Sequence, residues 1–241
     1  MTFEKFLRGR RRDQLTADDI VTLEHAAGEI RRVQARHTLV TEGDLVSAST
    51  YLVEGFMCRY LDDRKGERQL IAVHVPGDFV DLHGYPLKRL DHDIATITAC
   101  TIAQVPHGRL DEIMIERPGL AKLLWFSTLL DAAMHREWIF RLGRLDAVQR
   151  LGHFFCEMEA KLRAVGMSDG ATFPLPMTQT DLAETCGITS VHVNRMLRDL
   201  RERGLLHMQA GVVTIADRPA LYRLCEFDPG YLYLDANIAE H

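Results

Sequence analysis

The sequence predicts an α+β protein with an N-terminal antiparallel β-roll or jelly roll, a long central helix and a C-terminal winged helix-turn-helix. Three observations support this prediction. Short β-branched runs separated by turn residues fill residues 36–107. A helical pattern without a breaker covers residues 118–142. Two shorter helical patterns, followed by two strand-like runs, occupy residues 177–215.

Composition and charge limit the class of protein. The chain has 241 residues, of which 46% are hydrophobic, and a formal net charge of -5, which fits a folded chain of one large or two small domains. This charge excludes a uniformly basic nucleic-acid binder but not a local binding face. No apolar run approaches the roughly 18 residues of a membrane helix. The arginines of residues 8–12 precede a polar segment instead of a signal core, so we expect a cytoplasmic protein.

Cysteine and histidine spacing gives no metal motif. The five cysteines are far apart and form no CxxC pair, which favours reduced thiols over a zinc or iron–sulfur site. Jelly-roll metalloenzymes use closely spaced histidines with a carboxylate, but no HxH occurs here. We therefore predict that the protein is not an enzyme and has no resident metal. The scattered histidines of this region are His74, His83, His92 and His107.

The elements follow in order. The first is a predicted helix over residues 16–31, where Thr16 can cap the N-terminus. Strand-like runs and turn signals come next, and their spacing predicts a small antiparallel barrel or jelly roll. The runs are HTLVTEG, TYLVEGFMCRYL, RQLIAVHVPG and DIATITACTIAQVP, with turns at 42–44, 62–66 and 76–78. Beyond the central helix, residues 144–165 predict another helix and residues 167–176 a loop.

The central helix has two apolar faces. It begins at Pro118, a favoured first-turn residue, and meets no breaker before Gly143. Two faces require two partners, so we predict that one packs on the β-roll and the other on a second copy of the helix in a homodimer. Burial of the helix within one domain is the alternative. The first face is Leu123, Phe126, Leu130 and Met134, and the predicted dimer seam is Thr128, Ala132, His135, Ile139 and Leu142.

The helix-turn-helix is predicted from its caps. Thr178 and Asp181 resemble a capping box that starts a helix ending near Gly187. Thr189 can cap a second helix, predicted over 189–203, which stops before Gly204. Two strand-like runs, LLHM and VVTI, are joined by Gln-Ala-Gly and predict the wing.

The second helix has a face that suits a DNA major groove. Val193, Met196, Leu197 and Leu200 form its buried stripe, and Val191, Arg195 and Arg198 point the opposite way. Arg195 could donate two hydrogen bonds to a guanine edge, and the methyl groups of Val191 could pack on a thymine methyl. The first helix would hold the phosphate backbone. The predicted DNA-binding residues are Thr178, Gln179, Thr189, Ser190, Val191, His192, Asn194, Arg195 and Arg198. A structural three-helix domain with a solvated arginine face is the alternative.

Four segments in order resemble the CRP/FNR superfamily of bacterial transcription regulators. They are PGDFVDLHG, DIATITACTIAQVP, RLDAVQRL and ITSVHVNRMLRDL. The resemblance implies a cyclic-nucleotide-binding-like sensor domain over 1–117, a dimerisation helix over 118–143, and a DNA-binding domain with a C-terminal tail over 144–241. It also implies a homodimer that binds double-stranded DNA at a two-fold symmetric site with half-sites about one helical turn apart, and RNA polymerase as a further partner.

The chain departs from this family where cyclic-AMP-binding members hold the nucleotide. Leu82 falls at their glutamate and Asp93-Ile94 at their Arg-Ser pair, while His135 and Arg136 replace a Thr-Ser pair. An aspartate in place of the phosphate-binding arginine repels an anion. We therefore predict no tight binding of cAMP or cGMP and an unknown effector. The predicted effector pocket is Leu82, His83, Asp93, Ile94, His135 and Arg136.

Two other branches of the family sense their signals with an iron–sulfur cluster or a haem, and the sequence does not favour either group. No cysteine precedes Cys58, which disfavours the N-terminal iron–sulfur cluster of the oxygen-sensing branch. His83 resembles a haem-ligating histidine of the carbon-monoxide-sensing branch, but a satisfied or solvated loop histidine is the favoured interpretation. His135 on the seam either fixes the register of the dimer or makes it pH-sensitive. Val191 replaces a frequent glutamate, so the half-site cannot be copied from the family. The alternative function is a ligand- or partner-binding β-roll with a vestigial DNA-binding domain.

Overall fold

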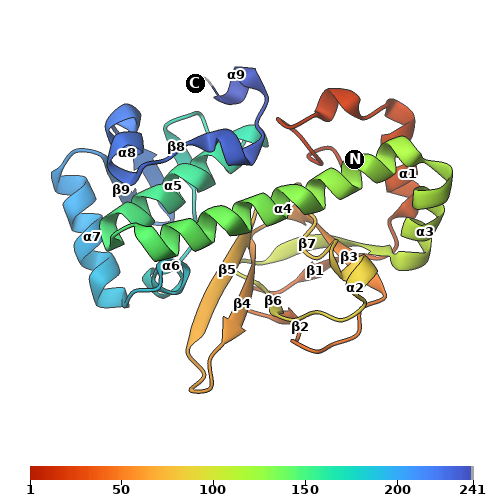
Figure 1. The fold of residues 1–241 in the computed structure, drawn as a ribbon, viewed down its shortest axis with the longest axis horizontal. Coiled ribbons are helices and arrows are strands. Elements are labelled where there is room, and N and C mark those ends of the chain that lie inside the picture. The colour runs from red at the N-terminus through yellow and green to blue at the C-terminus, as the bar shows by residue number, and fades with distance from the viewer. Residues whose placement is uncertain (240–241) are drawn as a thin grey trace. The chain divides into compact units, whose positions relative to one another are not determined.

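The computed structural model describes residues 1–239, which form two compact units (Figure 1). Unit 1 contains residues 1–61 and 72–132, and unit 2 contains residues 62–71 and those from 133 onward. The long helix α4 (Pro118–Arg144) contributes to both units. No helix within residues 1–239 has the length and apolar character needed to cross a membrane.

Two sheets form the N-terminal part of the chain, as the run of short strands predicted. One has the order β1-β7-β3 and the other the order β2-β6-β4-β5, and the pairs β1–β7, β3–β7, β2–β6 and β4–β6 are antiparallel. Buried Leu52, Met57 and Ile94 belong to one core cluster of unit 1. The strands are β1 (Ile30–Val33), β2 (Thr38–Val40), β3 (Ala48–Glu54), β4 (Met57–Asp62), β5 (Arg68–His74), β6 (Asp93–Thr96) and β7 (Cys100–Pro106).

Helices cover a second core cluster in unit 1. Phe3, Phe6 and Phe79 pack their rings around buried Tyr51, with side chains from α1, α3 and α4 beside them. The elements are η1 (Arg12–Gln14), α1 (Ala17–Ala26), α2 (Gly84–Leu87) and α3 (His107–Glu116). The structure has α3 where the sequence analysis expected no helix.

The predicted helix over 16–31 is wrong beyond Ala26. Thr16 caps α1 in a capping box with Asp19, as its position suggested. The chain then leaves the helix, because Gly28 donates its backbone N–H to the carbonyl of Gln104 and Ile30–Val33 pairs with β7. Sheet pairing far along the chain therefore overrides the local helical pattern.

The two long helices match their predictions closely. The central helix α4 starts at Pro118 and continues through Gly143 to Arg144. Asp146 caps α5 (Ala147–Ala164) through a reciprocal pair of hydrogen bonds with Gln149. Gly166 follows with a left-handed backbone, at a φ of 75°, which glycine adopts readily.

Unit 2 contains the winged helix. A three-stranded sheet has the order β8-β10-β9, in which β9 (Leu206–Gln209) and β10 (Val212–Ile215) form the predicted wing. The predicted loop 167–176 contains a strand that the sequence analysis missed, β8 (Thr172–Pro174), which pairs with β10. The other elements are α6 (Gln179–Cys186), α7 (Ser190–Glu202), α8 (Arg218–Cys225), η2 (Pro229–Leu232) and α9 (Ala236–Ala239).

The C-terminal tail, whose role the sequence left open, packs within unit 2 as far as it is described. Leu232 is fully buried, and the Tyr231 ring stacks on His153 of α5 with ring centroids 6.1 Å apart. Tyr233 is exposed. Residues 240 and 241 lie outside the described residues.

Candidate nucleic-acid interface

Local hydrogen bonds fix both helices of the helix-turn-helix. The Thr178 side chain accepts from the Asp181 N–H, and the Asp181 carboxylate accepts from the Thr178 N–H and hydroxyl at 2.7 Å each. Gly187 ends α6 in the left-handed region, and Thr189 caps α7 by accepting from the His192 N–H. These caps agree with the sequence prediction, and they determine where α7 begins.

One face of α7 is buried and the opposite face is open. Val193 and Leu200 are fully buried, with Met196 and Leu197 partly buried beside them. On the other side Val191 is 80% exposed, and Arg195 and Arg198 are exposed as well. An apolar side chain left so exposed next to two arginines suits contact with bases better than contact with water.

The other predicted DNA-binding residues lie on the same helix pair. Asn194 donates its side-chain amide to the Gln179 side chain at 3.5 Å, so the start of α6 and the middle of α7 share one surface. Thr178, Gln179, Thr189 and His192 are exposed, and Ser190 is partly buried.

A groove beside α7 is lined in part by two residues that the sequence analysis did not include in the DNA-binding face. Arg201, from the last turn of α7, and His207, from β9, line it together with Gln179, Asn194 and Arg198. Helical spacing of four and three residues from Asn194 through Arg198 places Arg201 on the same face. That spacing could have identified Arg201 from the sequence, whereas His207 depends on how the wing folds back.

The charges on this surface are available to a ligand. Within residues 1–239, Arg195, Arg198 and Arg201 form no ion pair, whereas Arg203 of the same segment is paired with Asp199 at 2.9 Å. The open face therefore carries uncompensated positive charge on a chain of net charge -5. A polyanion such as the DNA backbone matches that face.

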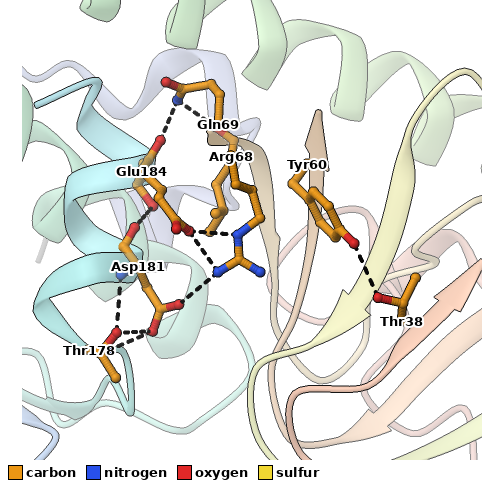
Figure 2. Close-up of polar contacts among 9 residues, drawn as sticks. Thr38, Tyr60, Arg68, Gln69, Thr178, Asp181 and Glu184 are labelled. Carbon is orange, nitrogen blue, oxygen red and sulfur yellow. Dashed lines mark hydrogen bonds and ion pairs between the residues drawn. The ribbon is translucent and has the colours of Figure 1, made fainter. Parts of the chain in front are cut away.

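Side chains from three elements hold the carboxyl end of α6. Three consecutive carbonyl groups, those of Glu184, Thr185 and Cys186, accept hydrogen bonds there. Their donors are Gln69 Nε2, Arg141 Nη2 at 3.3 Å and Arg150 Nη1 at 3.3 Å, respectively. A helix end leaves such carbonyls without helical partners, so these bonds fix the turn that precedes α7. Figure 2 shows the Gln69 contact.

Arg68 holds the carboxylates of the same helix. Its Nε and Nη2 donate to Glu184 Oε2 at 2.8 and 2.7 Å, and Nη2 lies 3.6 Å from Asp181 Oδ1 (Figure 2). Asp181 is also the capping-box residue of α6. Residues 62–71, which run from the end of β4 into β5, belong to unit 2. This segment therefore supports the first helix of the helix-turn-helix. No local pattern indicates this contact, because more than 100 residues separate its partners.

The central helix leaves an apolar face open. Trp125, Leu129 and Ile139 are 65%, 52% and 72% exposed, and Phe140 is also exposed. Of the predicted seam, Ile139 shares this exposure, whereas Thr128, Ala132, His135 and Leu142 are partly buried. The sequence analysis missed Trp125 and Leu129, although both continue the steps of four and three residues through Ala132. On the second predicted face, Leu123 and Leu130 are buried, with Phe126 and Met134 partly buried.

The residues of the predicted effector pocket have different environments. Leu82 and Ile94 are buried in separate core clusters of unit 1. The buried Asp93 carboxylate accepts from the Glu42 N–H at 3.3 Å. His135 and Arg136 belong to unit 2, where His135 is partly buried and Arg136 is exposed. His83 lies against His92, a residue that the pocket prediction did not include.

Arg59 of β4 is a buried cation in unit 1. Arg59 donates from Nη1 to Asp131 Oδ2 of α4 and from Nε to the Val80 carbonyl, both at 2.6 Å. Nearby Asp81 is fully buried and accepts from the Thr50 N–H and hydroxyl. Burial raises the pKa of Asp81 to about 6, although the hydrogen bonds from Thr50 and the charge of Arg59 oppose the rise.

Comparison with known families agrees with both parts of the fold. Residues 30–117 match the family model of the cyclic nucleotide-binding domain, and residues 149–224 match that of the Crp-like helix-turn-helix domain. The matches occur in the order that the sequence resemblance implied.

Similar proteins are regulators. The chain is 28% identical over 205 residues to the nitrogen fixation regulation protein FixK of Bradyrhizobium diazoefficiens. The aligned region covers 84% of this chain and 84% of FixK. It is 26% identical over 198 residues to the transcriptional activator protein FnrL of Cereibacter sphaeroides, covering 80% of this chain and 78% of FnrL.

Solved structures share the fold. FixK2 from Bradyrhizobium japonicum superimposes with a TM-score of 0.72 at 21% identity, over 82% of this chain and 96% of FixK2. The c-di-GMP responsive global regulator CLP of Xanthomonas campestris gives a TM-score of 0.67 at 19% identity, over 84% of this chain and all of the CLP chain. These similarities establish the fold.

Proposed function

Because the chain belongs to the CRP/FNR superfamily of transcription regulators, we propose that it acts as a homodimer that reads a two-fold symmetric DNA site through α7. The observation that carries this proposal is the open face of α7. On this face Val191, Arg195 and Arg198 are exposed, and the opposite face of the same helix is buried. Two such helices related by a two-fold axis address half-sites about one helical turn apart.

Each residue on this face has a distinct role in the proposal. Arg195 makes the bidentate contact with a guanine, worth about 1–3 kcal/mol of discrimination, and Val191 contacts a thymine methyl group. Arg201 and His207, which line the groove next to the wing, bind phosphates together with Thr178 and Gln179. Phosphate contacts fix the register of the protein on DNA, and base contacts supply the specificity.

The dimer forms through the open face of α4. We assign Trp125 and Leu129 to the interface together with the predicted seam. Apolar residues repeating in steps of four and three are the pattern of a helix that pairs with a second helix. Isolated exposed apolar residues are common, but a row of them on one helix marks an interaction surface.

Selection of random duplex DNA by the purified protein, at a stated salt concentration, tests the proposal. We expect enrichment of a two-fold symmetric sequence, and we expect Arg195→Ala to lose preference at one base pair of each half-site. Arg203→Ala is the matched control, because Arg203 lies just beyond α7 but is paired with Asp199. Its selected sequence should be unchanged.

Two outcomes of the selection would contradict the proposal. If no sequence is enriched, the alternative function gains support, in which the β-roll binds a ligand or partner and the helix-turn-helix is vestigial. If Arg195→Ala selects the same sequence as the unmodified protein, the open face of α7 is not the reading surface.

The sensor domain is expected not to bind cAMP or cGMP. Asp93 is buried where the sequence alignment places the phosphate-binding arginine of cyclic-AMP-binding members, and a carboxylate there repels a cyclic phosphate. Calorimetric titration of the protein with each nucleotide should therefore show no binding in the micromolar range. Micromolar affinity for either nucleotide would refute this prediction, whatever the DNA selection shows.

A further inference from the structure

Two histidines of unit 1 lie together with buried nitrogens that have no partner. His83 precedes α2 and His92 precedes β6, and their ring centroids are 5.1 Å apart with an angle of 39° between the planes. The Nε2 atoms of both are buried, and neither has a hydrogen-bond partner within residues 1–239. Buried polar atoms are normally satisfied, and an unsatisfied pair indicates an ion or water that completes the site.

Against the expectation from the sequence that the protein has no resident metal, we propose that His83 and His92 form a two-histidine binding site for a borderline transition-metal ion such as Zn²⁺. Imidazole nitrogen is a ligand that Zn²⁺, Ni²⁺, copper and iron accept readily. Zn–N bonds of about 2.0–2.1 Å at a tetrahedral angle place two imidazole centroids about 5 Å apart. The observed spacing of 5.1 Å fits that arrangement.

Asp91 orients one of the two ligands. His92 Nδ1 lies 2.8 Å from Asp91 Oδ1, so the Nδ1–H donates to the carboxylate and the lone pair remains on Nε2. Metal-binding histidines commonly have such a carboxylate behind the ring. A hydrogen-bond-accepting Nε2 suits a cation, because an anion at this position would need a protonated ring.

The surroundings keep both rings in the form that binds metals. Burial, together with the nearby charge of Arg59, lowers the pKa of His92 and lowers that of His83 to about 3. Both imidazoles are therefore neutral near pH 7, as metal ligation requires.

The site supplies two protein ligands and leaves the other positions open. Residues 1–239 contain no group of three or more histidine, cysteine, aspartate or glutamate side chains that could hold a metal ion. Zinc sites with an open position have three protein ligands, so at this two-histidine site water or small anions must supply the two remaining positions.

Metal titration of the chelator-treated, metal-free full-length protein tests the proposal, with Zn²⁺ as the probe and Co²⁺ for absorption spectra. We expect one Zn²⁺ per chain, a higher midpoint of thermal unfolding with Zn²⁺, and Co²⁺ bands of nitrogen ligation. His83→Ala and His92→Ala should each weaken binding at least about 100-fold. His37→Ala is the control, because His37 is exposed and lies in a different loop.

Asp91→Asn keeps the test decisive if a histidine variant fails to fold. The Asp91 side chain is 85% exposed, so its replacement should leave the fold intact, while Zn²⁺ affinity should fall about 10-fold to 100-fold. The proposal is overturned if the protein binds no stoichiometric Zn²⁺ at micromolar concentrations. It is also overturned if binding is unchanged in Asp91→Asn and in a folded variant lacking both histidines.

Discussion

Replacing Leu129 by glutamate is expected to dissociate the proposed homodimer and to abolish tight binding to a two-fold symmetric DNA site. Leu129 is 52% exposed on the open face of α4, between Trp125 and Ala132 in the repeat of four and three residues. Loss of a buried leucine removes about 2–3 kcal/mol from each copy, and two glutamates near the two-fold axis repel each other. The dimer dissociation constant should rise at least about 1,000-fold.

Sedimentation velocity over a range of protein concentrations measures this change, and titration of the selected DNA site measures its consequence. A dimer holds two recognition helices on one DNA molecule, so the second half-site is bound at a high effective concentration. The monomer loses that advantage, and its DNA affinity should fall at least about 100-fold.

Leu45→Glu is the matched control for the dimer. Leu45 is 72% exposed in the loop between β2 and β3, outside α4, so its substitution should change neither the mass of the particle nor DNA affinity. A Leu129→Glu protein that remains a dimer would show that the subunits associate through a different surface.

The parts of the fold that local interactions determine could be predicted from the sequence. The capping box of Thr178 with Asp181, the cap at Thr189 and the buried stripe of Val193 and Leu200 all involve residues close along the chain. Caps and periodicity are encoded within a few residues. For this reason the limits of α6 and α7 and most of the proposed DNA-binding face were predicted.

Elements that depend on distant pairing could not be predicted in the same way. Residues 30–33 follow a helical pattern, but they form a strand because β7 lies beside them. Strand β8 is short and becomes a strand through pairing with β10. Local patterns hold no information about a partner 40 or 70 residues away, so tertiary contacts decide these segments.

Polar groups that act together in space were also hidden in the sequence. Arg68 and Gln69 stand in an ordinary strand pattern, yet they contact Glu184 of α6. His83 and His92 are separated by α2 and a loop, and their spacing along the chain matches no metal-ligand motif. In each case the fold brings the side chains together, and neither composition nor periodicity predicts these contacts.

Glu157→Ala is expected to lower the free energy of unfolding of unit 2 by about 2–5 kcal/mol. Glu157 is buried in α5, and its two carboxylate oxygens accept from Trp138 Nε1 at 2.9 Å and from the Tyr231 hydroxyl at 2.7 Å. One carboxylate thus connects the end of α4, α5 and the C-terminal tail within unit 2.

The size of this effect follows from the donors that Glu157 satisfies. Its carboxylate is the acceptor for the Trp138 indole N–H and for the Tyr231 hydroxyl. Removing the carboxylate takes that acceptor away from both donors, and each such loss costs about 1–3 kcal/mol.

Urea unfolding measured by tryptophan fluorescence gives the change, and a double-mutant cycle with Tyr231→Phe locates it. Tyr231→Phe alone should lower the free energy of unfolding by about 1 kcal/mol. In the Glu157→Ala background it should restore stability instead, because it removes an unsatisfied hydroxyl. Glu157→Gln, which keeps one accepting oxygen but loses the charge, should fall between the unmodified protein and Glu157→Ala. If Glu157→Ala lowers the free energy of unfolding by less than 1 kcal/mol, or if the cycle is additive, then Glu157 does not couple the tail to α5, and the packing of Tyr231 and Leu232 alone must hold it.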